Sequence, residues 1–124
     1  MDDRLYAKIS VRLFTDDKCF GPGIASLLRR VEKHHSLRSA AASMGMAYSK
    51  AWTILKNCEK HLGFRLVNST VGGKNGGGAT LTDNAEAMLR AYDEYCAELM
   101  AHADRLLGEK FAFLGLYRIG EDKG

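Results

Sequence analysis

Side chains that donate hydrogen bonds or carry positive charge gather in one stretch of this sequence, residues 36–56. Hydroxyl and cationic groups at this density suit contacts with phosphate oxygens and with the polar edges of bases. The candidate binding residues are Ser36, Arg38, Ser39, Tyr48, Ser49, Lys50, Thr53 and Lys56, joined farther along by Lys74 and Asn75. Lys50 is the best candidate for a guanine contact and Lys56 for a phosphate contact. Trp52 could either pack in a core or touch a base, and the sequence leaves this open.

The side-chain sets that catalysis usually requires are missing from the sequence. It contains no Ser–His–acid set, no His-Glu-x-x-His motif and no paired carboxylates in a recognisable pocket. In the glycine-rich stretch 72–78, no Ser or Thr follows Lys74 as a nucleotide-binding P-loop needs. We therefore expect no enzyme, no catalytic residue, no cofactor and no metal. A weaker alternative is a metal or thiol sensor built from His34, His35, His61, His102, Cys19, Cys58 and Cys96.

Charge is distributed unevenly along the chain. Residues 21–81 contain nine basic and two acidic side chains, whereas residues 82–124 contain five basic and nine acidic ones. The net charge of +3 conceals this asymmetry. A basic middle next to an acidic end is typical of a protein in which one part binds phosphate groups.

Length and composition are those of one ordinary globular domain with room for an appendage. No apolar run reaches the roughly 20 residues that span a bilayer. The first residues, Met-Asp-Asp-Arg, lack the basic and then apolar pattern of a secretory signal. Three scattered cysteines, an odd number, do not indicate a disulfide framework. We expect a cytoplasmic protein with no membrane contact.

The elements that would position the candidate residues form a helix-turn-helix, residues 36–62. An alanine-rich helix is predicted over about 37–44, Gly45 breaks it, and Met46 fills the corner. A second helix is predicted over about 48–62, because its apolar residues fall on one stripe. That stripe consists of Ala51, Leu55, Cys58 and Leu62. Small residues let two helices joined by a short turn cross steeply, and the second helix of such a motif enters the DNA major groove.

Short strands and one more helix surround this motif in the predicted fold. Arg4–Phe14 alternates apolar and polar residues, which predicts a half-buried strand. A Gly-Pro-Gly sequence then favours a helix over about 23–34. Behind the motif, strands at about 65–69 and 79–81, joined by a glycine-rich loop, predict a β-hairpin wing.

A long helix is predicted over about 82–108, with Thr82 as N-cap and Gly108 as the stop. Its apolar residues keep a heptad register over three repeats, which favours packing against another helix, most simply that of a second copy. The alternative is that the stripe covers the protein's own core. The predicted dimerisation residues are Leu89, Tyr92, Cys96, Leu99, Ala103 and Leu106. The apolar tail 109–124 would pack across the dimer or form an edge strand.

Several motifs together resemble one known family. They are Gly21-Pro22-Gly23, Leu27-Leu28, Ser36-Leu37, Ala40-Ala41, Gly45 to Trp52, Leu62-Gly63, Leu66-Val67, Gly72-Gly73, and Gly76 to Ala79 with Leu81-Thr82. Over roughly residues 5–107 the chain is similar to the N-terminal DNA-binding domain of the molybdate-responsive, ModE-type transcriptional regulators. Those domains are winged helix-turn-helices related to the LysR type. The family's C-terminal pair of molybdate-binding β-domains has no counterpart here, so we expect no molybdate sensing through such a module.

The predicted fold is mainly α with small β: a winged helix-turn-helix with an N-terminal strand and a long C-terminal dimerisation helix. Residues 1–81 would form the DNA-binding domain, with its wing at 65–81, followed by the dimerisation helix 82–108 and the tail. The predicted function is a homodimeric, sequence-specific transcriptional regulator whose partners are double-stranded DNA and a second copy. Alternatives are a protein-interaction module, a non-specific architectural DNA binder and, by family association alone, a molybdate-binding protein. The operator, the direction of regulation and any effector or partner protein stay open.

Overall fold

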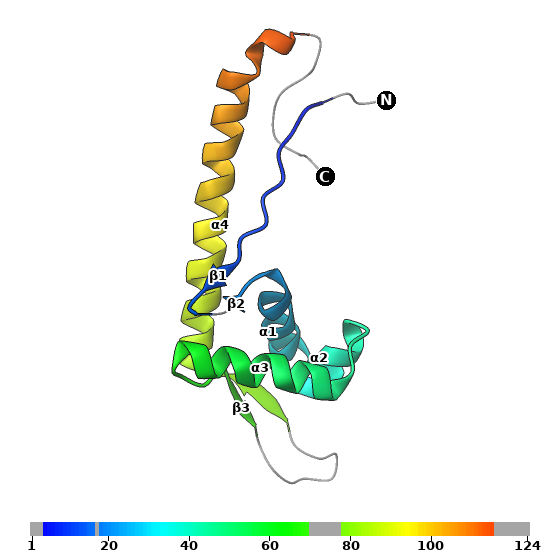
Figure 1. Ribbon diagram of the computed structural model, residues 1–124. Helices are drawn as coiled ribbons and strands as arrows, with labels where there is room; N and C mark the ends of the chain where they lie inside the picture. The colour runs from blue at the N-terminus through cyan, green and yellow to red at the C-terminus, as the bar shows by residue number, and fades with distance from the viewer. Residues whose placement is uncertain (1–3, 17, 70–77, 116–124) are drawn as a thin grey trace. The chain divides into compact units, whose positions relative to one another are not determined.

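The computed structural model describes residues 4–16, 18–69 and 78–115. Within them the elements follow the order β1 (Leu13–Phe14), β2 (Lys18–Phe20), α1 (Pro22–His34), α2 (Leu37–Ser43), α3 (Tyr48–Leu62), β3 (Val67–Ser69), β4 (Ala79–Leu81), α4 (Asp83–Lys110) and the 3₁₀ turn η1 (Ala112–Leu114) (Figure 1). The predicted fold class, mainly α with small β and a long C-terminal helix, is confirmed.

The chain divides into two compact units. Residues 11–90 form one unit, which holds α1 to α3, all four strands and the beginning of α4. Residues 1–10 and 91–124 form the other, which holds the rest of α4 and η1. The helix-turn-helix and its wing therefore belong to a single unit.

The helices of the first unit bury their apolar stripes against one another. The stripe of α3 is closed to solvent, with exposed fractions of 0% at Ala51, 2% at Leu55 and 2% at Cys58. Leu62, the last residue of the predicted stripe, is half-buried. The facing residues of α1 and α2 are also buried: Ile24, Leu27, Leu28, Val31, Ala40 and Ala41. Each fully buried leucine, isoleucine or valine side chain contributes about 1.5–3 kcal/mol, so this cluster fixes where α3 lies.

Two glycines set the ends of the helices around the turn. Gly45 has φ +67° and follows the end of α2, while Gly63 has φ +84° and caps α3. These are left-handed conformations that glycine adopts without the cost other residues incur. The Met46 amide then donates to the carbonyl of Ala41 at 2.9 Å, which closes the turn. The break at Gly45 and the cap at Gly63 are confirmed.

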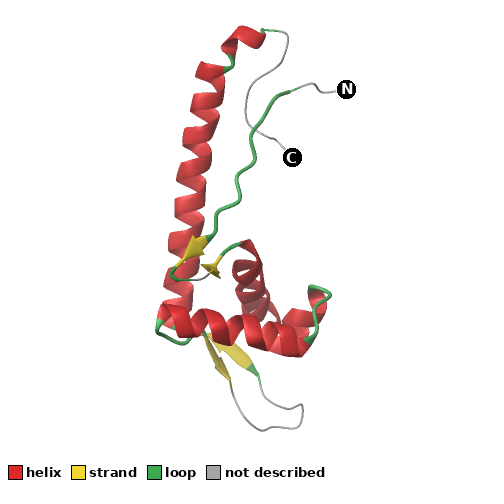
Figure 2. Cartoon of the chain, in the orientation of Figure 1, coloured by secondary structure: helices red, strands yellow, loops and turns green. Residues whose placement is uncertain are grey.

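The predicted strand Arg4–Phe14 is largely wrong. Only an isolated bridge at Leu5 and the two residues of β1 are extended in a ladder, and the segment between them is loop (Figure 2). Alternation is partly present, but Ile9 is 48% exposed where the pattern predicted burial. Period-two alternation indicates an extended segment with one apolar and one polar face. A β-strand also needs a neighbouring strand to which its backbone groups can form hydrogen bonds.

The predicted stop at Gly108 is also wrong, because α4 continues to Lys110. A glycine inside a helix costs only about 1 kcal/mol relative to alanine, and the Phe111 amide still bonds to the Leu107 carbonyl at 3.1 Å. Of the tail, η1 is described, and residues 116–124 lie outside the described part of the chain. Among the described helices, none combines the length and the apolarity that crossing a bilayer requires.

Candidate nucleic-acid interface

The first turn of α2 and the first turn of α3 meet through their side chains. Ser36 is the N-cap of α2, and its hydroxyl oxygen accepts from the Ser39 amide at 3.1 Å. The guanidinium of Arg38 lies over the ring of Tyr48, 4.2 Å from the centroid. Arg38, Ser39 and Tyr48 are exposed, so the structure brings four of the candidate residues together on one surface.

The exposed side of α3 continues this surface. Ser49, Lys50 and Thr53 are all exposed. The Thr53 hydroxyl donates to the Ser49 carbonyl at 2.9 Å, so its hydrogen is engaged while its oxygen lone pairs can still accept. The Lys50 ammonium group is the cation nearest in sequence to the beginning of the helix. Cations and acceptors at the N-terminal part of such a helix are what base edges and phosphates bind.

Trp52 is not part of the core. It is 48% exposed, and the Lys56 ammonium group lies 5.7 Å from the centroid of its ring. The question that the sequence left open is therefore answered against packing: Trp52 shares the exposed side of α3 with Tyr48 and Lys56.

Glu59 is a positioning residue that the sequence did not indicate. Its Oε2 accepts from the Leu66 amide at 2.7 Å and from the Val67 amide at 3.4 Å, and its Oε1 pairs with Lys56 Nζ at 3.3 Å. Leu66 and Val67 are buried, at 0% and 3% exposure. One carboxylate therefore joins α3 to the strand that begins the wing. The only sequence signal was a lone acid within a basic stretch.

Arg30 performs a similar task between α1 and α2. Its Nη1 donates to the carbonyl oxygen and the hydroxyl of Ser43, at 2.8 Å and 2.9 Å. Arg30 is half-buried and holds the last residue of α2.

The wing is an antiparallel hairpin in which Val67 pairs with Leu81 and Ser69 with Ala79. The hairpin is tied to the end of α1 through the first residue of β4, because the Ala79 amide donates to the His35 carbonyl at 2.9 Å. Thr82 donates through its hydroxyl to the Arg65 carbonyl at 2.7 Å and caps α4 by accepting from the Ala85 amide at 3.0 Å. Thr82 as N-cap is confirmed. Lys74 and Asn75 lie outside the described residues.

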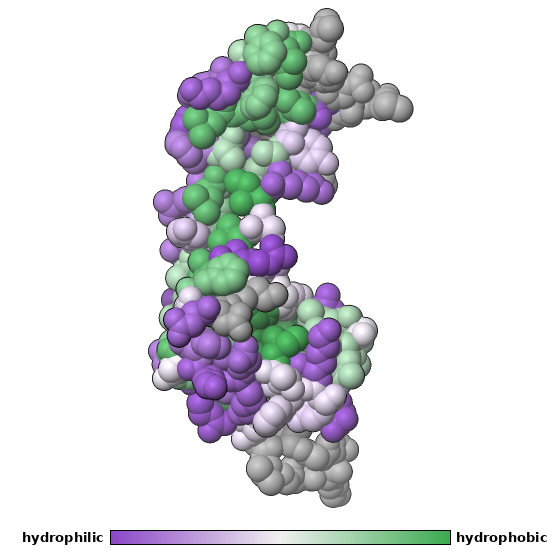
Figure 3. Space-filling model, in the orientation of Figure 1, coloured by the Kyte–Doolittle hydropathy of each residue, from purple (hydrophilic) through white to green (hydrophobic). Residues whose placement is uncertain are grey.

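The heptad stripe of α4 is buried near the beginning of the helix and becomes more exposed toward its end. Leu89 and Tyr92 are buried, at 8% and 6% exposure, whereas Leu99 and Leu106 are 36% and 37% exposed. Cys96 and Ala103 are half-buried. Apolar residues are exposed on the visible face of this part of the chain (Figure 3). Beyond α4, Phe111 and Phe113 are 43% and 79% exposed. Within the described residues of one chain, the later part of the stripe is thus less covered than its beginning.

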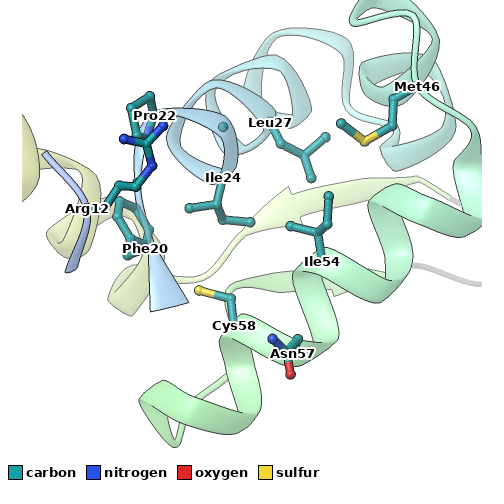
Figure 4. Close-up of a pocket in the computed structure, with 11 residues that line it drawn as sticks. Arg12, Phe20, Pro22, Ile24, Leu27, Met46, Ile54, Asn57 and Cys58 are labelled. Atoms are coloured by element: carbon teal, nitrogen blue, oxygen red, sulfur yellow. The ribbon is translucent and has the colours of Figure 1, made fainter. Parts of the chain in front are cut away.

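A pocket of about 330 Å³ lies on the core side of α3, where Ile24 and Leu27 of α1 and Ile54 of α3 converge (Figure 4). Its lining is mainly apolar, with Arg12 and Asn57 at the edge. It contains none of the candidate binding residues. In the described ranges, no three His, Cys, Asp or Glu side chains are grouped to hold a metal ion.

Comparison with known proteins gives one family and several relatives. The family model described as "Bacterial regulatory helix-turn-helix protein, lysR family" matches residues 25–86. The chain is 35% identical over 89 residues to the transcriptional regulator ModE of Haemophilus influenzae, covering 72% of this chain and 33% of that protein. It is 32% identical over 89 residues to the DNA-binding transcriptional dual regulator ModE of Escherichia coli K12, covering 72% and 32%. The molybdenum-pterin-binding protein MopB of Rhodobacter capsulatus is 34% identical over 67 residues, covering 54% and 25%. The chain thus matches about a third of the length of the two ModE regulators.

Proposed function

Since the chain belongs to the bacterial regulatory helix-turn-helix proteins of the LysR family, we propose that it is a sequence-specific DNA-binding transcriptional regulator. One observation carries the proposal. The exposed side of α3 presents Tyr48, Ser49, Lys50 and Thr53, while the opposite side of the helix is anchored in the core. A helix held in this way can enter the major groove with its polar side chains directed at base edges.

In the proposed complex α3 lies in the major groove, with Lys50 reaching a guanine. Arg38, Ser36 and Ser39 at the start of α2 contact phosphates, as does Lys56. The glycine-rich loop of the wing, with Lys74 and Asn75, is assigned to the flanking DNA on the sequence alone. Residues 21–81 contain nine basic and two acidic side chains. This positive charge supports the assignment of DNA binding to this region, because phosphate contacts dominate affinity for DNA.

The regulator acts as a homodimer in this proposal, through the stripe Leu89, Tyr92, Cys96, Leu99, Ala103 and Leu106 of α4. The support is the exposure of Leu99 and Leu106 at 36% and 37%, together with the heptad spacing. A second copy would bury the exposed parts of Leu99 and Leu106 and set two α3 helices on two half-sites of a pseudo-palindromic operator. A cytoplasmic location and the absence of catalytic activity are part of the same proposal.

The test is a fluorescence-anisotropy titration with a random duplex pool at two salt concentrations, followed by selection and sequencing of the bound fraction. A steep salt dependence with an enriched inverted repeat is expected. Steep salt dependence without any enriched sequence would replace the regulator by an architectural DNA binder. Absence of binding at both salt concentrations would favour a protein-interaction module.

A further inference from the structure

The exposed side of α3 carries two aromatic rings that the core does not use. Tyr48, Trp52 and Lys56 follow one another at intervals of four, so they form one ridge on the helix. Trp52 is 48% exposed and Tyr48 38%, while Ala51 on the core side is fully closed to solvent. A tryptophan and a tyrosine therefore stand next to each other on the part of the helix that is proposed to enter DNA.

Each ring has a cation beside it. Arg38 lies 4.2 Å from the centroid of Tyr48, and Lys56 Nζ lies 5.7 Å from the centroid of Trp52. Cations are attracted to ring faces, and these two remain at the surface, since Arg38 is exposed and the Lys56 side chain is 41% exposed. The ridge is thus an apolar surface bordered by positive charge. It fits a ligand with an apolar group bordered by negative charge.

Duplex DNA offers one such group in the major groove, the C5-methyl of thymine, which lies between two phosphate backbones. The indole of Trp52 has a single N–H donor and a large apolar face, so a methyl group uses more of it than a polar base edge would. We propose that Trp52, supported by Tyr48, contacts a thymine methyl and is a specificity-determining residue. This inference rests on the proposed function and names one base that it reads.

The experiment is a uracil scan of the operator obtained by selection. Each thymine is replaced singly by uracil, which removes the methyl group and leaves the base pair otherwise unchanged. Dissociation constants are measured by fluorescence anisotropy at one salt concentration for the wild-type protein, Trp52→Ala and Tyr95→Ala. Tyr95 is the matched control, because it is a 52% exposed aromatic residue on α4 outside the predicted dimer stripe.

At one or two thymines, uracil is expected to weaken wild-type binding about three- to fivefold, the effect of withdrawing one methyl group from an apolar contact. In Trp52→Ala the same replacement should make no further difference, as a double-mutant cycle requires of two groups in contact. Tyr95→Ala should behave as the wild type does.

Three results would overturn the inference. A flat uracil scan of the wild-type protein would do so without any variant, and would leave the proposed regulator standing. A uracil effect that persists undiminished in Trp52→Ala would assign the methyl contact to another residue. Failure to select any operator would remove the proposed function, and this inference with it.

Discussion

Lys50 lies in the first turn of α3 with its side chain exposed. If its ammonium group contacts a guanine, Lys50→Ala should weaken binding to the selected operator by about 1–3 kcal/mol. Lys60→Ala is the matched control, because it removes an exposed lysine from the last turn of the same helix. Anisotropy titrations with the operator and with unselected duplex distinguish a contact to a base from a contact to a phosphate. Equal losses on both duplexes would reassign Lys50 to a phosphate.

Glu59 contributes to stability rather than to contact with DNA. In Glu59→Ala the buried Leu66 and Val67 amides lose their acceptor, and leaving a buried donor unsatisfied costs about 1–3 kcal/mol. Urea denaturation should show a fall in the free energy of unfolding of about this size. Glu32→Ala, at an exposed position on α1, should change it by no more than about 0.5 kcal/mol. Similar losses of unfolding free energy in both variants would show that Glu59 does not stabilise the junction between α3 and β3.

Residue roles were predictable only where they depend on local sequence. Thr82 was predictable as the N-cap of α4, because capping depends on the next three residues. Glu59 and Arg30 act on residues 7 and 13 positions away, and no local pattern indicates such partners. Trp52 was ambiguous for the same reason: whether a ring packs or stays exposed is decided by the neighbouring helices.

Among the elements, α4 carries the prediction that concerns assembly. Leu99→Glu combined with Leu106→Glu would place two carboxylates in the stripe proposed to pack against a second copy, and burying charge without a partner is costly. The variant should therefore sediment as a monomer where the wild type sediments as a dimer. Ala101→Glu adds one carboxylate at an exposed position off the stripe and should remain dimeric. A dimer that survives the double substitution would place the interface elsewhere.

Helices were predicted better than strands, for a physical reason. The bounds of α3 follow from its stripe and from the glycines beyond its two ends, all of which are local. The segment Arg4–Phe14 shows the limit of this reasoning. Its alternation predicts one long strand, yet the only ladder that forms there is the pairing of Leu13 and Phe14 with β2, because a strand also needs partners for its backbone groups. Gly108 shows another limit: a glycine is a weak stop when neighbouring residues continue the backbone hydrogen bonds.

At the scale of the whole molecule, charge and apolar surface are separated along the chain. The basic residues are concentrated in 21–81, which contains the helix-turn-helix and wing, and the acidic excess falls in 82–124, which contains the exposed part of the stripe. This separation suits a division of work in which one region binds phosphates and the other binds a second copy. The acidic excess would also repel DNA from residues 82–124, so that phosphates bind to the basic region 21–81 instead.

The same division predicts how binding depends on operator spacing. A dimer that holds its two α3 helices at a fixed separation must bind half-sites on the same side of the duplex. Inserting five base pairs between the half-sites, about half a turn of B-DNA, rotates one away from the other. Affinity should then fall to that of a single half-site, measured by anisotropy on duplexes of equal length. The Leu99→Glu, Leu106→Glu variant should bind both duplexes alike, since a monomer does not sense spacing. If the wild type also bound both alike, each α3 would act independently, and the dimeric mode of recognition would have to be abandoned.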